Sequence, residues 1–267
     1  MTTVSLVVTT YNWKEALRLV LASALVQSRL PDEIIVADDG SRPDTGELVD
    51  VMAAGSPVPL IHSWQEDQGF RAAMGRNRAI ARATGDYIVL IDGDMLLEPH
   101  FIADHLAVAR PGRFVQGSRV LLAEQRTRQV LAEGVTRIAP LASGIENRKN
   151  CIRSRWLSAL FSHAGQGLNG IKTCNFAFWR RDALAVNGFN EEFVGWGRED
   201  SEFAARLLNN GIQRYTLKFM ATAYHLFHPV QPRDRLPAND DLLARVVSEK
   251  TTWCAHGIGQ YLGDDHG

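Results

Sequence analysis

Apolar and polar positions alternate along the first third of the chain in two different periods. Short β-branched runs that end in polar or acidic residues are typical of buried strands, and apolar residues at helical spacing indicate helices. Strands are expected within residues 4–12, 33–41, 58–64 and 87–91, and helices within residues 13–27 and 72–83. This repeated order of strand and helix predicts an α/β fold, with a mostly parallel central sheet flanked by helices.

The apolar run from Tyr87 to Ile91 ends abruptly in Asp92-Gly93-Asp94. In open α/β sheets ligands bind beyond the carboxyl ends of the strands, where both aspartates would lie. Two carboxylates separated by one small residue can hold a hard divalent cation, and that cation can carry a diphosphate. A turn with two solvated acids is the alternative, because chance often produces this tripeptide.

Composition limits the classes of protein that fit. A chain of 267 residues can form one large α/β domain or two fused halves. A net charge of -1, from 29 basic and 30 acidic residues, does not indicate nucleic acid as a partner. Three widely spaced cysteines fit a reducing cytoplasm. Since no apolar run approaches the roughly 20 residues that span a bilayer and Met1 leads into a strand, we expect a cytoplasmic protein, at most peripheral to a membrane.

An ordered set of motifs resembles the family-2 glycosyltransferases of the GT-A fold. The matching pieces are residues 4–12, Asp38-Asp39-Gly40-Ser41, Arg76-Asn77, Ala83-Thr84-Gly85-Asp86-Tyr87 and Asp92-Gly93-Asp94. Further on, residues 188–193 and Gly195-Trp196-Gly197-Arg198-Glu199-Asp200 are similar to an acceptor-side signature of β-1,4-galactosyltransferases and bacterial chondroitin-type polymerases. The resemblance implies a GT-A domain over residues 1–229, with a nucleotide-sugar half (1–94) and an acceptor half (95–229). Residues 230–267 would form a helical extension.

The resemblance also implies a nucleotide site at the first strand ends. Asp39 would accept a hydrogen bond from N3–H of uracil, and Thr9 and Tyr11 would flank the base and ribose. Arg71 would face the diphosphate or the base pocket. On the residues alone, the less favoured alternative for Asp39 is an Asx-turn acid before Gly40. Thr9 and Tyr11 could be strand-end residues, and Arg71 could be a solvated arginine that opens a helix.

For the metal, the resemblance implies Asp94 as a ligand, with Asp92 directed toward the ribose or a metal-bound water. His225 would be a further ligand, after a strand-like run over residues 214–223. His228 is open to three roles: ligand, substrate contact or packing. Carboxylate, imidazole and phosphate oxygens together suit Mn²⁺, with Mg²⁺ as the alternative. A histidine without such a context is more often a satisfied core or surface residue.

On the acceptor side, the resemblance assigns Asp200 as the base that takes the proton from the acceptor hydroxyl. Glu199 would hydrogen-bond the acceptor sugar, Trp196 would offer its indole face to a sugar ring, and Asn175 would be a polar acceptor contact. The alternative for the two acids is a favourable interaction with the first turn of a helix expected over residues 200–210. Trp196 could be a core residue instead.

Two segments carry less information. Residues 141–174 are basic and glycine-rich, and we expect an irregular stretch that serves as a lid, contacts an anionic acceptor or stays a solvated loop. Arg76 and Asn77 are interpreted as structural supports of the acidic loop. Residues 239–255 predict a helix capped by Asn239, followed by a glycine-containing tail open to oligomer or membrane contacts.

The resulting hypothesis is a metal-dependent, inverting transferase. It would move a hexose from a nucleotide-diphosphate sugar, expected to be a UDP-sugar, to a hydroxyl of a glycan or lipid-linked glycan. The expected setting is bacterial surface polysaccharide or lipopolysaccharide synthesis. A sugar-phosphate nucleotidyltransferase is one alternative, disfavoured because residues 9–12 lack a glycine-rich phosphate loop. A non-catalytic nucleotide- or carbohydrate-binding module is the other, disfavoured because all four candidate acids are present.

Overall fold

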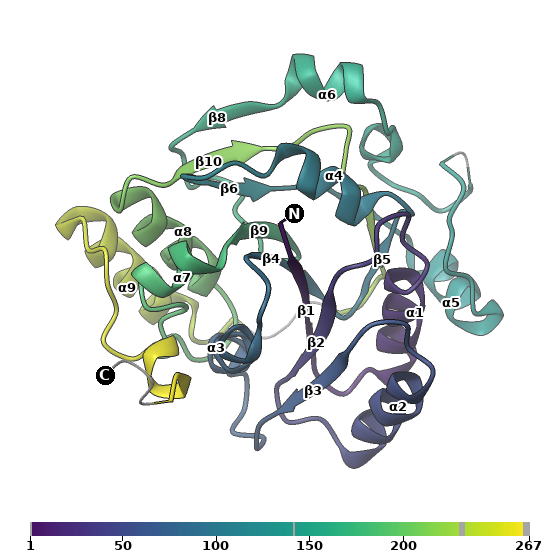
Figure 1. The fold of residues 1–267 in the computed structure, drawn as a ribbon, viewed down its shortest axis with the longest axis horizontal. Helices are drawn as coiled ribbons and strands as arrows, with labels where there is room; N and C mark the ends of the chain where they lie inside the picture. Colours follow the sequence, from purple (N-terminus) through teal and green to yellow (C-terminus); the bar gives the residue numbers. More distant parts are fainter. Residues whose placement is uncertain (1, 141, 230–232, 264–267) are drawn as a thin grey trace.

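A mixed eight-stranded sheet forms the centre of the protein (Figure 1). The computed structural model describes residues 2–140, 142–229 and 233–263. The strand order is β3-β2-β1-β4-β9-β6-β10-β8. The strands are β1 (Val4–Thr10), β2 (Glu33–Asp38), β3 (Leu60–Trp64), β4 (Tyr87–Asp92), β6 (Arg113–Gln116), β8 (His163–Gly165), β9 (Asn175–Trp179) and β10 (Gln213–Thr216). The α/β fold is confirmed. Parallel pairing joins β3, β2, β1 and β4 and, separately, β6 and β10, because β9 is antiparallel to both of its neighbours.

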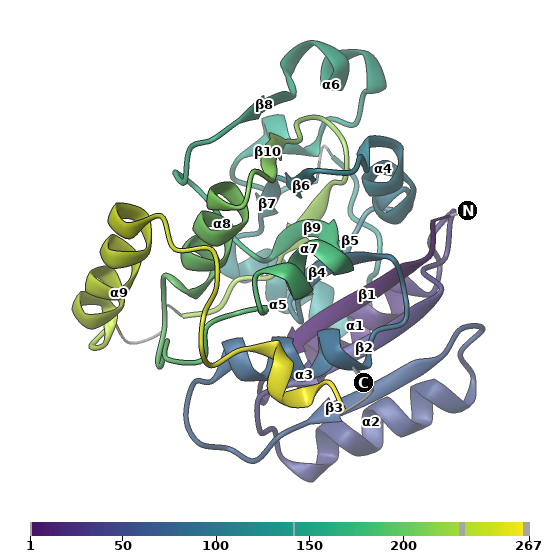
Figure 2. The same ribbon diagram turned by 60° about the vertical axis from the view of Figure 1, so that its left-hand side comes forward.

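Helices cover both faces of the sheet (Figures 1 and 2). They are α1 (Lys14–Ala24), α2 (Pro43–Ala54), α3 (Ala72–Arg82), α4 (Phe101–Val108), α5 (Glu124–Glu133), α6 (Arg155–Phe161), α7 (Arg180–Ala185), α8 (Glu199–Asn209) and α9 (Leu236–Glu249), with 3₁₀ turns η1 (Arg148–Cys151) and η2 (Ile258–Tyr261). Alternate residues of β1 point to opposite faces, so Leu6 and Val8 join the core beneath α1, while Val7 joins the core beneath α3 and α8. Among the described residues, no helix is both long and apolar enough to cross a membrane.

A second, small sheet connects distant parts of the chain. Its order is β5 (Met95–Leu97), β11 (Ala223–His225) and β7 (Arg119–Leu121). β11 pairs antiparallel with β5, which places His225 opposite Met95, and parallel with β7. The amide of Leu226 also donates to the carbonyl of Asp94 at 2.9 Å. The small sheet therefore brings the end of β11 beside the loop that follows β4.

Several element boundaries differ from the sequence-based expectations. The strand expected over residues 214–223 is wrong as a single strand, because its ends belong to β10 and β11 in different sheets. The stretch 141–174, expected to be irregular, contains η1, α6 and β8. The C-terminal helix begins at Leu236, so Asn239 does not cap it. Instead, Asn239 donates from its side chain to the carbonyls of Val194 and Gly197.

A buried ion pair fixes the loop that leads into α8. Glu202 and Arg206 lie one helical turn apart and are fully buried, with the guanidinium bonding both carboxylate oxygens. Arg206 also donates to the carbonyls of Val186 and Gly188. A buried charge is tolerated when every donor finds a partner, so this pair ties the start of the acceptor-side loop to the helix behind it.

We predict that Arg206→Leu lowers the free energy of unfolding by about 3–5 kcal/mol, because it leaves the Glu202 carboxylate buried without its partner. Urea denaturation measures the change. The double variant Glu202→Leu/Arg206→Leu should be less damaging, since it removes both charges. Arg128→Leu is the matched control, because Arg128 pairs with Glu124 at the same spacing on an exposed surface, and it should change stability by less than about 1 kcal/mol. Equal losses in the two single variants would contradict the assignment.

Candidate active site

A cleft of about 840 Å³ opens beyond the carboxyl ends of β1 and β4. Its volume lies in the range of small-molecule sites. The register of the sheet places Thr9 beside Asp92, so the residues at these strand ends meet. Ten of the twelve residues that the sequence singled out line this cleft: Thr9, Tyr11, Asp39, Asp92, Asp94, Trp196, Glu199, Asp200, His225 and His228.

Asp94 lies close to His225 and His228, two histidines far from it in the sequence. Its Oδ2 atom is 3.5 Å from Nε2 of His225 and 3.2 Å from Nε2 of His228. One ligand atom from each of the three residues lies within 4.8 Å of the others. The second carboxylate oxygen of Asp94 is buried and has no hydrogen-bond partner among the residues that the structure describes. Two imidazole nitrogens and a carboxylate that share one small space fit a divalent cation such as Mn²⁺.

The loop that carries Asp94 depends on close backbone contact. The amide of Gly93 donates to the carbonyl of Thr9 at 2.7 Å. A Cβ at Gly93 would lie 3.0 Å from that carbonyl oxygen and 3.1 Å from the side chain of Thr10. A larger residue would push the loop off β1, so glycine between the two aspartates sets the position of Asp94.

The two histidines differ in environment. Burial lowers the pKa of His225 to about 4, against the attraction of Asp94, so this imidazole is neutral near pH 7. A neutral ring can offer its Nε2 lone pair to a cation. The hydrogen bond to Asp94 raises the pKa of His228 from its usual value. His228 is also the more exposed of the two, and its ring meets that of Trp13 edge-on.

Arg76 joins the two acidic groups of the cleft. This buried guanidinium donates to Oε1 of Glu199 at 3.0 Å and lies 3.7 Å from Oδ1 of Asp92. The neighbouring Asn77 donates to the carbonyl of Phe189, whose own amide donates back to Asn77. Both side chains come from α3, but only Arg76 reaches the acidic loop that both were expected to support, whereas Asn77 holds residues 189–191 of the acceptor-side segment.

Asp200 has an unusual acidity for a carboxyl group. Burial raises its pKa to about 7, the charge of Glu199 adds to the increase, and Arg76 opposes it. One of its oxygens accepts hydrogen bonds from the amide and hydroxyl of Ser201. Burial and the charge of Asp94 raise the pKa of Asp92 to about 6, again against Arg76. A carboxyl with a pKa near neutrality can both take and release a proton.

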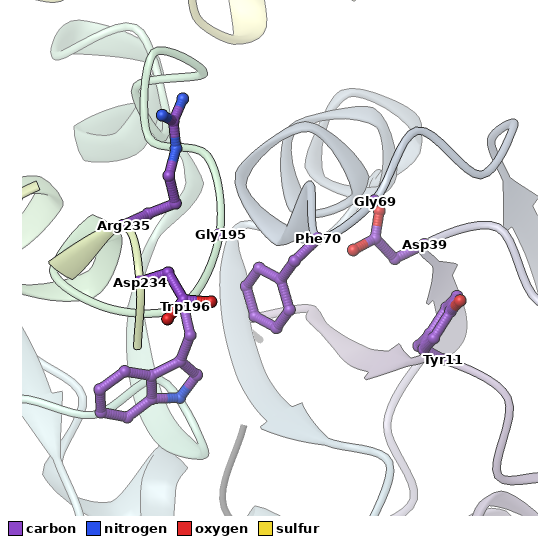
Figure 3. A pocket seen from close by; sticks show the side chains of 8 residues that line it. All are labelled: Tyr11, Asp39, Gly69, Phe70, Gly195, Trp196, Asp234 and Arg235. Atoms are coloured by element: carbon purple, nitrogen blue, oxygen red, sulfur yellow. The ribbon is translucent and has the colours of Figure 1, made fainter. Parts of the chain in front are cut away.

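A smaller hollow of about 320 Å³ adjoins the cleft (Figure 3). Asp39 and Tyr11 lie on one side of it, Trp196 lies on the other, and Phe70 stands between them. Asp39 accepts hydrogen bonds from the side chain of Gln65 at 2.6 Å and from the amide of Arg71 at 2.8 Å. Burial raises the pKa of Asp39 to about 6, while both of these bonds oppose the increase.

Two expected site residues have other roles in the structure. Asn175, expected as an acceptor contact, is fully buried outside the cleft lining. Its amide nitrogen donates to the carbonyls of Ser118 and Ala221, and its oxygen bonds His105. That expectation is corrected, because the side chain has no free group to offer a ligand. Arg71 does not line the cleft either. It contacts Asp39 through its backbone amide, which donates a hydrogen bond to that carboxylate.

Sequence reasoning missed several cleft cations, among them Arg119 and Lys172. Arg119 comes from β7, and Lys172 comes from residues 168–174, which form part of one cleft wall. Neither makes an ion pair within the described ranges. Lys172 lies in the segment suspected of closing over the donor, so its basic composition was a signal. Arg119 had no signal, because only the small sheet brings β7 to the cleft.

Three residues that line the cleft carry a buried polar atom without a recorded partner. Among the described residues, none hydrogen-bonds the Thr9 hydroxyl, Asp94 Oδ1 or Glu199 Oε2. Buried polar groups in native proteins are nearly always satisfied, so unpaired ones at a cleft indicate positions that a ligand completes. These atoms lie at the first strand end, in the Asp94 cluster and at the start of α8, so they outline one extended site.

Comparisons with known proteins agree with this geometry. The sequence model described as glycosyl transferase family 2 matches residues 5–186, and one described as the N-terminal domain of galactosyltransferase matches residues 159–229. Chondroitin synthase of Escherichia coli is 26% identical over 93% of this chain and 38% of its own length. Hyaluronan synthase of Pasteurella multocida is 25% identical over 93% of this chain and 27% of its own length. The chain thus spans well under half of these curated relatives.

Solved structures show the same fold. The crystal structure of S. aureus TarS 1-349 in complex with UDP superimposes with a TM-score of 0.63 at 16% identity. The match covers 93% of this chain and 65% of that one.

Proposed function

Because the chain belongs to glycosyl transferase family 2, we propose that it transfers a hexose from a nucleotide-diphosphate sugar to a hydroxyl of a glycan, with inversion at the anomeric carbon. One observation carries the proposal. The Asp94–His225–His228 cluster and the Glu199–Asp200 pair open into one cleft. The first set suits a diphosphate with its cation, and the second suits an attacking hydroxyl.

The donor's nucleotide is proposed to occupy the side of the cleft formed by residues 1–94, and the acceptor the side formed by residues 95–229. Asp39 keeps lone pairs free beside its bonds to Gln65 and Arg71, so it can accept N3–H of uracil. Tyr11 lies next to it in the small hollow, where its ring can pack on the base (Figure 3). UDP in the TarS structure supports a uridine nucleotide as the donor carrier.

A divalent cation, Mn²⁺ or Mg²⁺, is proposed to sit at Asp94, His225 and His228. When bound, it would neutralise the charge that builds on a departing nucleoside diphosphate. Asp92 stands at the same strand end, where it can orient the ribose or a water. The neighbouring cations Arg119 and Lys172 add positive charge to the same wall of the cleft.

The acceptor chemistry follows from the different surroundings of two adjacent acids. Glu199 is ion-paired with Arg76, so one of its oxygens is committed and the other is free to hold an acceptor hydroxyl. Asp200 can take the proton of the attacking hydroxyl. The new bond forms at the anomeric carbon as the bond to the diphosphate breaks, and this single displacement inverts the carbon. Trp196 presents an aromatic ring at the cleft, where it can pack on a sugar.

The acceptor is proposed to be a growing polysaccharide or a lipid-linked glycan of a bacterial surface. The relatives include synthases of chondroitin and hyaluronan, which are glycan polymers. A cleft of about 840 Å³ can admit the end of such a chain.

We predict that Asp94→Ala abolishes UDP binding in the presence of Mn²⁺, because it removes the carboxylate shared by both histidines. Calorimetric titration of UDP with and without Mn²⁺ measures this. His225→Ala should weaken the Mn²⁺ effect more than His228→Ala, since His225 is neutral and more buried. His163→Ala is the control, as His163 is exposed and outside the cleft lining. If Asp94→Ala still bound UDP with the help of Mn²⁺, the metal assignment would be wrong. If His228→Ala weakened the Mn²⁺ effect more than His225→Ala, His228 would be the more important ligand.

We predict that Asp39→Ala weakens UDP binding by about 1–3 kcal/mol, the usual loss when a charge-assisted hydrogen bond is left unmade. The loss for CDP should be smaller, because cytosine has no N3–H to donate in its usual tautomer. Calorimetry on both nucleotides measures the difference. Asp50→Ala is the control, because Asp50 is exposed on α2 and lines neither the cleft nor the smaller hollow. Equal UDP affinity in wild type and Asp39→Ala would contradict the base contact.

We predict that Asp200→Asn keeps UDP affinity but lowers turnover by about 10²–10⁴-fold, the usual contribution of a positioned acid–base group. In the wild type, kcat/KM should rise with pH through about 7, because Asp200 must lose its proton to act as a base and its pKa is raised to about 7. The variant should lose that rise.

Glu199→Gln should instead raise mainly the acceptor KM. NMR of the product gives the anomeric configuration. Near-normal turnover of Asp200→Asn would remove it from the mechanism, and a retained configuration would overturn the inverting displacement.

A further inference from the structure

Exposed apolar side chains gather on one short segment at the edge of the fold. Eleven large apolar or aromatic residues of the described chain are exposed, and four of them fall within residues 152–161. They are Ile152, 47% exposed, Trp156, 73% exposed, Leu160, 62% exposed, and Phe161, 52% exposed. Scattered exposed apolar residues are ordinary, but a local cluster marks a surface that another phase or molecule covers.

The helix α6 is amphipathic, but its apolar face points toward the solvent and a serine is buried. Trp156 and Leu160 lie one turn apart and are both exposed, so they share an outward face. Ser158, which is buried, faces the protein and bonds the Ser162 hydroxyl at 3.1 Å. Ser162 in turn accepts the amide of Lys218 at 3.0 Å. A helix of a water-exposed surface would place serines outward and tryptophan inward, so this one is built to meet an apolar environment.

The patch is held rigidly. Ser154 caps α6 by accepting the amide of Leu157, and its own amide donates to the carbonyl of Phe219 at 2.8 Å. The ring of Phe161 packs on that of Phe219 with centroids 5.5 Å apart. The outward rings are therefore presented by a fixed base and do not need a disordered loop to reach a partner.

The stretch of sequence that carries the patch has charged residues of one sign. Residues 147–181 contain no aspartate or glutamate but seven basic residues: Arg148, Lys149, Arg153, Arg155, Lys172, Arg180 and Arg181. Arg153 is paired with Asp104 and Glu98. Arg148, Lys149 and Arg155 are exposed and make no ion pair within the described part of the chain. Free positive charges beside exposed Trp and Leu complement an anionic surface that also has an apolar layer.

The position of the patch leaves it accessible and connects it to the cleft. α6 precedes β8, the edge strand opposite β3, and both views show α6 at the periphery (Figures 1 and 2). From β8 the chain runs on to residues 168–174, which form part of one cleft wall.

We propose that Ile152, Trp156, Leu160 and Phe161, together with the exposed cations Arg148, Lys149 and Arg155 of the same segment, form a docking surface for a lipid bilayer with anionic headgroups. The apolar side chains insert at the level of the headgroups, where tryptophan is favoured because one part of its ring is apolar and its N–H is polar. The cations contact the negative headgroups, and the two terms add. This surface is distinct from the transfer cleft, and its binding to vesicles does not depend on the proposed activity.

The test is co-sedimentation of the full 267-residue chain with vesicles of phosphatidylcholine alone or mixed with phosphatidylglycerol. The wild type should bind the mixed vesicles and release them as salt is raised. Trp156→Ser/Leu160→Ser should weaken binding at least about tenfold, because the variant loses two apolar side chains that would be buried in the bilayer. Arg148→Gln/Lys149→Gln should weaken it about fivefold per charge, and only on the mixed vesicles.

Matched controls remove the same chemistry elsewhere on the surface. Val51→Ser/Trp253→Ser takes away one exposed aliphatic and one exposed tryptophan on other elements. Arg128→Gln/Arg245→Gln takes away two exposed charges of α5 and α9. Both should bind vesicles like the wild type. The melting temperature of each variant checks that it folds, and Trp156→Phe should keep binding but lose most of the fluorescence blue shift that vesicles cause.

Three outcomes would overturn the proposal. The first is a wild type that ignores mixed vesicles, and the second is a patch variant that folds and binds them normally. The third is a dimer in sedimentation equilibrium that Trp156→Ser/Leu160→Ser dissolves without any vesicle binding, which would make the patch an interface between two copies. Loss of vesicle binding with UDP affinity unchanged supports the bilayer surface and leaves the cleft assignment untouched.

Discussion

The buried guanidinium of Arg76 is the interaction on which the geometry of the cleft depends. It lies between Asp92, at the end of β4, and Glu199, at the start of α8. Without this positive charge, four carboxylates would share one partly buried space, and mutual repulsion would favour their protonation or separation. One arginine therefore makes it possible to place a cation-binding acid pair and a proton-accepting acid pair a short distance apart, on segments separated by more than a hundred residues.

The parts of the site that follow from local pattern could be predicted from the sequence. Parallel strands β1, β2 and β4 end at a common edge, so Thr9, Asp39 and Asp92 had to meet once the strands were recognised. The glycine between Asp92 and Asp94 is also a local feature of the sequence, and it allows the loop to approach β1 closely. The contact of His225 with Asp94 is non-local, and it was expected only from the family resemblance. Its physical cause is the antiparallel pairing of β11 with β5.

Long-range pairing also explains the errors. The run 214–223 has the composition of one strand, but its ends satisfy backbone bonds in two sheets, which no local period records. Asn175 has the residue type of a ligand contact, yet its amide holds together β9, the start of β7 and the loop before β11. Arg119 reaches the cleft only through the small sheet. Helix α6 is too short for an apolar period, and its inverted polarity becomes visible only when burial is known.

The adjacent acids Glu199 and Asp200 show how one helix start can serve two purposes. Both benefit from the positive end of α8, which by itself would favour ionisation of either. Arg76 forms an ion pair with Glu199. Asp200 has Ser201 as its only hydrogen-bond partner in the described part of the chain, so burial and a neighbouring negative charge dominate its surroundings. Glu199 is therefore held in place with its charge compensated, whereas the pKa of Asp200 lies near 7. Two chemically similar side chains can then divide holding and proton transfer between them, because one charged partner is unequally shared.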